Sequence, residues 1–139
     1  MKTIGIMIER QRMYGRRLCE GIIGFARRRP DWSLKIIDFQ DIFRAGHLCG
    51  YDGFIARVMD DETAAALKAT GKPVVDVFCE KSYPNFGSAD QNARLVGQMA
   101  ARHFIEHRFT RFAFCGYNGR SYSDRRRDAY MRFLELNHF

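Results

Sequence analysis

The chain has 139 residues, the length of one domain, and its 46% hydrophobic and 28% charged residues exclude a disordered protein. A formal charge of +7 leaves nucleic acid or another acidic partner open, but does not show that the basic residues share one face. No apolar run reaches membrane-spanning length, and the apolar stretch at the N-terminus is too short for the hydrophobic region of a signal peptide. We therefore expect a cytoplasmic protein.

Apolar, β-branched runs alternate with helical patterns along the whole chain. The expected order is strand 3–8, helix 14–28, strand 33–39, strand 52–58, helix 60–71, strand 73–78, helix 91–107, strand 111–116 and helix 123–137. Residues 40–51 are a weak helical turn or a loop, and residues 79–90 a polar loop. This order predicts an α/β fold, a three-layer α-β-α arrangement with a mostly parallel sheet and right-handed crossovers.

Two of the expected helices carry readable local signals. Asp60 and Asp61 could form a pair of carboxylates, but the pattern favours an aspartate as the N-cap of helix 60–71. In helix 91–107, Val96, Met99, Ala100 and His103 form one stripe, which predicts that His103 is a packed core histidine rather than a catalytic one.

The four cysteines lie far apart in the sequence, with no CxxC or His-paired spacing. The pattern predicts buried free thiols in a reducing compartment, and no metal site. Catalytic and nucleotide motifs are also missing: there is no GxGxxG, Walker A or GxSxG sequence. We therefore expect a protein that is not an enzyme and that needs no cofactor.

Polar residues gather where the predicted strands end. In open parallel sheets, ligands bind outside the carboxyl ends of the strands. The segments that follow those ends are rich in arginine, tyrosine and carboxylates; they are 9–15, 39–41, 56–61, 77–82 and 116–124. The fold thus predicts a polar ligand at this edge of the sheet.

Three consecutive arginines, Arg125 to Arg127, open the last predicted helix if Ser123 or Asp124 is its N-cap. Helical phase places Arg126 on the face that Ala129, Leu134 and Leu136 mark as sheet-facing. Arg126 then either reaches into a ligand pocket or pairs at the surface, and the pattern leaves both open. Arg125 and Arg127 flank that face, and we expect them to be solvated or paired with Asp124 and Asp128.

Several segments together resemble the xylose-operon regulator family, whose sensor is lactose-repressor-like and of the periplasmic-binding-protein type. They are "MYGRRLCEGIIGFARRRPDWSL", "DGFIARV", "PVVDV", "GQMAARHFIEHRFTRFAFCGY" and "YSDRRRDAY", within residues 3–134. The resemblance implies a bacterial transcription regulator that closes around xylose or a related pentose. It also implies an attached arabinose-regulator-type DNA-binding domain, and a possible homodimer.

The resemblance further implies two lobes. Residues 1–108 correspond to the N-terminal lobe, and residues 109–139 to the first strand and helix of the C-terminal lobe. The rest of that lobe and the DNA-binding domain would lie outside this sequence, so we expect a truncated part of a longer regulator.

The family's ligand contacts map onto particular residues of this chain. Arg126 matches the arginine that precedes a small and an aromatic residue at the start of the last helix. The strand-end contacts correspond to Glu9, Arg12, Tyr14 and Arg57. A further family contact, usually an aspartate, falls on Asn92 by counting or on Asp90 if the loop shifts, and the sequence does not decide between them.

Two alternatives come from other classes of protein. The basic clusters Arg27–Arg29 and Arg125–Arg127 could make the chain a nucleic-acid-binding module, although no nucleic-acid-binding motif accompanies them. The other alternative is a flavodoxin-like enzyme. Against it, this sequence shows no catalytic nucleophile, no set of metal ligands and no glycine-rich turn.

Overall fold

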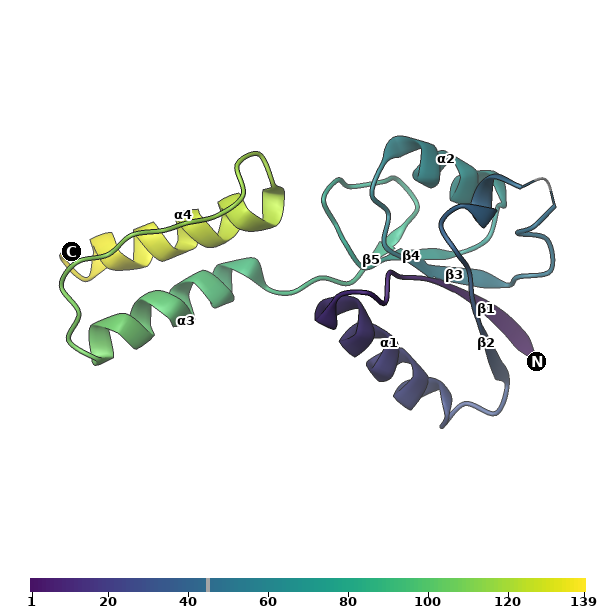
Figure 1. Cartoon of the computed structure of the whole chain (residues 1–139), viewed down its shortest axis with the longest axis horizontal. Coiled ribbons are helices and arrows are strands. Elements are labelled where there is room, and N and C mark those ends of the chain that lie inside the picture. The colour runs from purple at the N-terminus through teal and green to yellow at the C-terminus, as the bar shows by residue number, and fades with distance from the viewer. Residues whose placement is uncertain (45) are drawn as a thin grey trace. The chain divides into compact units, whose positions relative to one another are not determined.

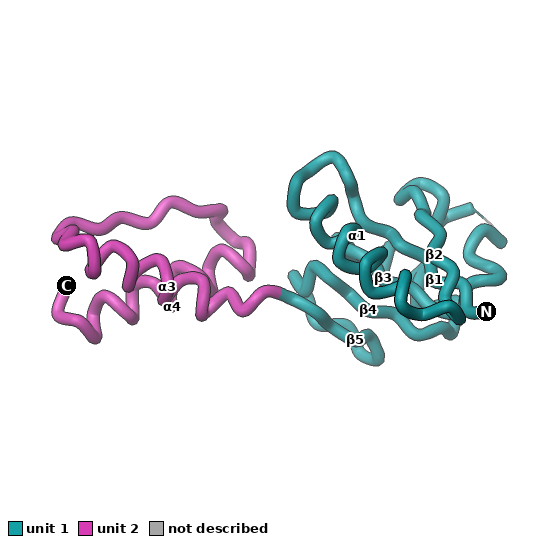
Figure 2. The backbone as a smooth tube through the Cα atoms, turned by 90° about the horizontal axis from the view of Figure 1, so that it is seen from below, with its two compact units in different colours: residues 1–90 teal, residues 91–139 magenta. Residues whose placement is uncertain are grey.

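The computed structural model describes residues 1–44 and 46–139 (Figure 1). The chain divides into two compact units, residues Met1–Asp90 and Gln91–Phe139, drawn in different colours in Figure 2. The predicted lobes 1–108 and 109–139 remain a prediction.

The first unit contains a parallel five-stranded sheet in the order β2-β1-β3-β4-β5. Its strands are β1 (Lys2–Met7), β2 (Trp32–Ile36), β3 (Gly53–Ala56), β4 (Val74–Asp76) and β5 (Gly87–Ser88). Every neighbouring pair of strands is parallel, so all five carboxyl ends lie at one edge. This confirms the predicted parallel α/β sheet. The short strand β5 is a correction, because its residues were expected to be part of a polar loop.

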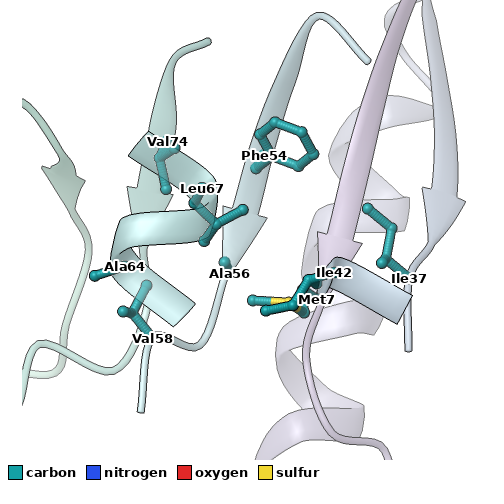
Figure 3. Close-up of a cluster of buried hydrophobic side chains, with 9 residues drawn as sticks. All are labelled: Met7, Ile37, Ile42, Phe54, Ala56, Val58, Ala64, Leu67 and Val74. Carbon is teal, nitrogen blue, oxygen red and sulfur yellow. The ribbon is translucent and has the colours of Figure 1, made fainter. Parts of the chain in front are cut away.

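Helices cover both faces of this sheet (Figure 1). Helix α1 (Met13–Ala26) packs on one face, where Ile6, Ile8, Cys19 and Val77 are buried. Helix α2 (Asp61–Ala69) and the 3-10 turn η1 (Asp41–Phe43) pack on the other. The larger of the two cores lies there, and Figure 3 shows its nine buried side chains, among them Met7, Phe54 and Leu67. The three-layer prediction is therefore confirmed.

Segment 40–51 was predicted to be a weak helical turn or a loop. The turn η1 and the loop after it match that prediction, while residue 45 lies outside the described residues.

The second unit is a pair of packed helices, α3 (Ala93–Glu106) and α4 (Ser121–Leu136). Helix α3 buries Ala93, Gly97 and Ala101, which are spaced four residues apart and therefore share one face. Helix α4 buries Ala129, Tyr130 and Leu134 among others. Small residues on α3 thus allow a close approach to larger residues on α4.

Residues 111–116 form no strand, contrary to the prediction. Within residues 91–139, all of which the structure describes, the regular elements are helices, so this segment has no strand beside it in its unit. A strand is stabilised by backbone hydrogen bonds to a neighbouring strand. An apolar segment that has no neighbouring strand therefore does not form one.

The predicted buried stripe of α3 was also wrong. Val96 and Met99 are exposed, as are Ala100 and His103, because the small residues rather than the large apolar ones face α4. His103 is therefore not a packed core histidine. Leu136, expected to face inward, is 70% exposed at the end of α4.

The cysteines match the prediction only in part. All four are free, but only Cys19 is buried, whereas Cys49 and Cys115 are exposed and Cys79 is intermediate. Burial raises the pKa of the Cys19 thiol, which lowers its reactivity.

Candidate ligand-binding site

The carboxyl ends of β1 and β3 lie at the switch point of the sheet, where the strand order reverses its direction. Strand β1 pairs with β2 on one side and with β3 on the other, so the chain crosses over β1 between them. A crevice outside the carboxyl ends of such strands is the usual ligand site of an open α/β sheet. Two of the residues predicted to bind ligand, Glu9 and Arg57, follow these two strands.

Glu9 and Arg57 form an ion pair at this position. The Nη1 of Arg57 donates a hydrogen bond to Oε1 of Glu9, and the side chain of Arg57 is 14% exposed and that of Glu9 24% exposed. The guanidinium also lies over the ring of Phe78, 4.3 Å from its centroid. The Nε of Arg57 is buried without a hydrogen-bond partner among the described protein groups. A buried donor without an acceptor is costly.

The loop that carries Glu9 is fixed by the start of α1. A Cβ on Gly15 would lie 1.7 Å from the carbonyl oxygen of Glu9, so only glycine permits this approach. The Nη1 of Arg16 donates to the carbonyl oxygen of Gln11, 3.1 Å away, within the same loop. The backbone of Glu9 is thus held by contacts that do not involve its carboxylate.

Beside Glu9 the surface contains a hollow of about 470 Å³. It lies at the ends of β1 and β2 and is lined by both polar and apolar side chains: Ile8, Glu9, Arg10, Gln11, Ile36, Ile37, Asp38, Phe39 and Met59. Its volume is in the range typical of small-molecule sites. Opposite charges at its walls suit a neutral, polar ligand better than a strongly charged one.

Asp76 is a functional candidate that sequence reasoning missed. It is only 2% exposed at the end of β4, and its carboxylate accepts hydrogen bonds from three backbone N–H groups. The donors belong to Val58, Phe78 and Cys79. A signal was present in the sequence, because an aspartate inside the apolar run 73–78 must find partners if the run is buried.

The other strand-end predictions are more exposed. The Nε of Arg12 is 3.9 Å from Oε1 of Glu9, and its side chain is 80% exposed. Tyr14, in the first turn of α1, is 38% exposed. Asp90 is exposed and is the last residue of the first unit. The structure therefore brings Glu9 and Arg57 together, with Arg12 at their margin.

The two remaining candidates, Asn92 and Arg126, belong to the second unit. The side-chain oxygen of Asn92 accepts from the backbone N–H of Leu95 at 3.0 Å, so Asn92 caps α3. The Nη2 of Arg126 donates to Oε1 of Gln91 at 2.8 Å, and its guanidinium lies 5.4 Å from the centre of the Tyr122 ring. Ligand roles for both residues remain predictions.

The three arginines do not open their helix. Helix α4 begins at Ser121 after Arg120, not after Ser123 or Asp124, so the arginines occupy its second turn. The hydroxyl of Ser123 instead accepts from the backbone N–H of Tyr117. Arg127 pairs with Asp124 and with Asp128, which confirms the expected surface pairing.

A second polar cluster lies at the start of α2 and in the loop after β4. The Nζ of Lys81 contacts Asp61 at 2.7 Å, and the hydroxyl of Tyr83 donates to the same carboxylate at 3.1 Å. Burial, then the hydrogen bond to Asp61, raises the pKa of Tyr83 to about 12. Hydrogen bonds from Lys81 and Tyr83 lower the pKa of Asp61. Neither group is prepared to transfer a proton near neutral pH.

Over residues 1–44 and 46–139, no group of three or more His, Cys, Asp or Glu side chains could hold a metal ion. In the same part of the chain, no helix has both the length and the apolarity to cross a membrane.

Comparison with known proteins gives structural matches only. No family model matches the sequence, and no curated protein does. Among solved structures, the transcription regulator CcpA of Lactococcus lactis has a TM-score of 0.78 at 16% identity. That match covers 99% of this chain and 55% of CcpA. Over the matched residues, the chain has the α/β fold of this regulator.

Two further matches support that statement. One is a periplasmic binding protein/LacI transcriptional regulator from Alkaliphilus metalliredigens complexed with D-xylulofuranose, with a TM-score of 0.74, 18% identity and coverage of 99% and 53%. The other is the xylose-binding transcription activator xylR, with a TM-score of 0.75, 23% identity and coverage of 96% and 35%. The chain thus spans about half of the first two proteins and about a third of the last.

Proposed function

We propose that this chain is the sugar-sensing region of a bacterial transcription regulator, and that its ligand is xylose or a related pentose. The observation that carries the proposal is the Glu9–Arg57 pair at the switch point of the sheet, where Arg57 lies over Phe78 and Glu9 lines a hollow of small-molecule size. Sugar hydroxyls both donate and accept hydrogen bonds, so a carboxylate and a guanidinium in one place match them.

The structural relatives support this choice of ligand. The protein from Alkaliphilus metalliredigens is complexed with D-xylulofuranose, xylR is described as xylose-binding, and a LacI family regulator from Enterococcus faecium has bound ribose. All three ligands are five-carbon sugars. A binding function without catalysis also agrees with the regulators and binding proteins among these relatives.

Isothermal titration calorimetry with D-xylose, D-ribose and D-xylulose tests the proposal, using the full natural protein that carries this sequence. We expect saturable binding of one of these pentoses. Arg57→Ala and Glu9→Gln should each weaken it roughly tenfold or more, because each leaves the other charge of a part-buried pair unmatched.

Arg28→Ala is the matched control, since this exposed arginine lies just after α1 and outside the hollow. It should leave sugar affinity unchanged. A folded protein that gives no heat with any of the three sugars would contradict the proposed function.

The regulatory part of the proposal is that sugar binding favours a closed arrangement of two lobes, the predicted 1–108 and 109–139, and so changes how attached DNA-binding domains are presented. Arg126 and either Asp90 or Asn92 would then contact the sugar in addition to Glu9, Arg12, Tyr14 and Arg57.

We also propose a cytoplasmic location and a homodimer. The reading frame beyond Phe139 tests this part, because a helix-turn-helix sequence there would support it.

A second candidate function is direct nucleic-acid binding, and one observation favours it. Residues 91–139 hold nine arginines and no lysine against four acidic residues, so the second unit is distinctly basic. Retention on duplex DNA should then fall steeply as salt rises. Weak or salt-independent retention would exclude this function.

A further inference from the structure

A single buried carboxylate connects the parts of the candidate site in the first unit. Asp76 lies at the end of β4 and is 2% exposed. Its Oδ1 accepts from the backbone N–H of Val58 at 3.2 Å and of Phe78 at 2.8 Å, and its Oδ2 accepts from Cys79 at 3.1 Å. Both oxygens are therefore used, and each of these donors belongs to the backbone.

Two of the three donor residues, Val58 and Phe78, determine the position of Arg57. Val58 is the next residue after Arg57 along the chain and is buried. Phe78 supplies the ring on which the guanidinium lies. One carboxylate thus fixes both the backbone that carries Arg57 and the surface that supports its side chain.

The bond to Cys79 holds a backbone conformation that would otherwise be unfavourable. Cys79 has φ of 53°, in the left-handed region that residues other than glycine rarely adopt. The hydrogen bond from its N–H to Asp76 compensates for that cost within the turn that follows β4. The position of Phe78, directly before this turn, depends on the turn keeping its shape.

We infer that Asp76 is a positioning residue, which sets the Arg57 guanidinium over Phe78 and toward Glu9 before any ligand arrives. A preorganised polar group binds its ligand more tightly because it loses less freedom on binding. The inference deepens the proposed function, on which its sugar-binding consequence rests. The arrangement of Arg57 itself can be measured without any ligand.

NMR of the Arg57 Nε–H group provides that measurement on the 139-residue chain. Because this nitrogen is buried, we expect its proton to exchange slowly, and the ring of Phe78 should shift the signal upfield from that of free arginine. Asp76→Asn removes one acceptor and Asp76→Ala removes both. We expect a partial loss of the upfield shift in the first variant and loss of most of it in the second.

Asp61→Asn is the matched control, because it changes an exposed carboxylate elsewhere at the strand ends. It should leave the Arg57 signal in place. If Asp76→Ala does not fold, Asp76→Asn decides alone. An unchanged Arg57 signal in a folded Asp76 variant would overturn the inference, even if the variant melts earlier, since a purely structural role predicts that combination.

Sugar titrations separate this inference from the proposed function. If the full protein binds D-xylose, D-ribose or D-xylulose, Asp76→Asn should weaken binding roughly tenfold, and adding Arg57→Ala should weaken it little further. A fully additive loss would count against positioning through Arg57. If no sugar binds, the proposed function fails, while the NMR result still supports or overturns the role of Asp76.

Discussion

The α-carbon of Gly97 in α3 faces the backbone of Arg126 in α4 at a distance that excludes any side chain. A Cβ at Gly97 would lie 2.3 Å from the carbonyl oxygen of Arg126 and 3.0 Å from the backbone nitrogen of Tyr130. Both atoms belong to a helical backbone, so neither can move aside without moving the helix. This contact sets the spacing of the two helices of the second unit.

We therefore expect Gly97→Ala to destabilise the second unit by about 1–3 kcal/mol, the usual cost of overpacking. Hydrogen exchange should show faster exchange of α3 and α4 amides while the sheet of the first unit stays protected. Gly21→Ala in α1 is the control, because nothing lies within 4 Å of its added Cβ. That change should stabilise α1 by about 0.5–1 kcal/mol. Equal effects of the two changes would contradict this account.

The start of α2 supports a second prediction. Oδ1 of Asp60 accepts from the backbone N–H of Thr63 at 2.7 Å, which confirms the predicted N-cap. Asp60→Ala should lower the free energy of unfolding by about 1 kcal/mol, as measured by urea unfolding near neutral pH. Asp60→Asn should retain most of the stability, because its side-chain oxygen can still accept the bond.

The same cap should depend on pH in a defined direction. The hydrogen bonds from Thr63 lower the pKa of Asp60 from its ordinary value of 3.8. The stabilisation is therefore complete above that value and is lost as the pH falls through the lower folded pKa. The difference between the wild type and Asp60→Ala should shrink in acid, and a constant difference down to pH about 2 would contradict the charge dependence.

The sequence predicted the first four strands because buried parallel strands are near-continuous apolar runs. It failed where pairing is not local. Strand β5 has only Gly87 and Ser88, neither of which favours a strand, and it exists because β4 pairs with it. Residues 111–116 have the composition of a strand but no neighbouring strand within their unit. Sequence composition alone cannot state whether a hydrogen-bonding partner is present.

The packing of α3 shows a different limit. A hydrophobic stripe was expected to mark the buried face, but size decided the packing here. Gly97 and Ala101 permit the close helix contact, so Val96 and Met99 remain on the outside. A pattern that ranks residues by hydrophobicity places the larger side chains inside and misses a face built from small ones.

The candidate site was predictable in part. Glu9 and Arg57 follow from the rule that ligands bind at strand ends, and the structure joins them although they are far apart in sequence. The role of Asp76 was not predicted, because the strand-end rule considers the residues that follow a strand, and Asp76 lies within β4. Its three partners are backbone N–H groups, which leave no mark in the side-chain sequence.

Alkaline titration gives a further prediction. Burial and the hydrogen bond to Asp61 raise the pKa of Tyr83 from 10.0 to about 12. The folded state thus favours the neutral phenol, so its stabilisation is present below pH 10 and is lost as pH rises toward 12. Tyr83→Phe should make stability less dependent on pH in this window, as measured by thermal unfolding. Tyr117→Phe, at a 72% exposed position, should not change that dependence.

The Glu9–Arg57 pair supports the last prediction, which concerns energetic coupling. The pair is part-buried, and its two residues lie at the ends of adjacent strands. Glu9→Gln and Arg57→Gln should each destabilise the chain, and the double variant should lose less than the sum of the two. We expect a coupling energy within about 0.5–3 kcal/mol from urea unfolding of the four proteins. The same cycle on Lys81 and Asp61, whose side chains are 58% and 71% exposed, should give no measurable coupling, because solvent screens that pair. If the two cycles gave the same result, Arg57 would be no better fixed than a surface lysine, and the preorganisation assigned to the site would be wrong.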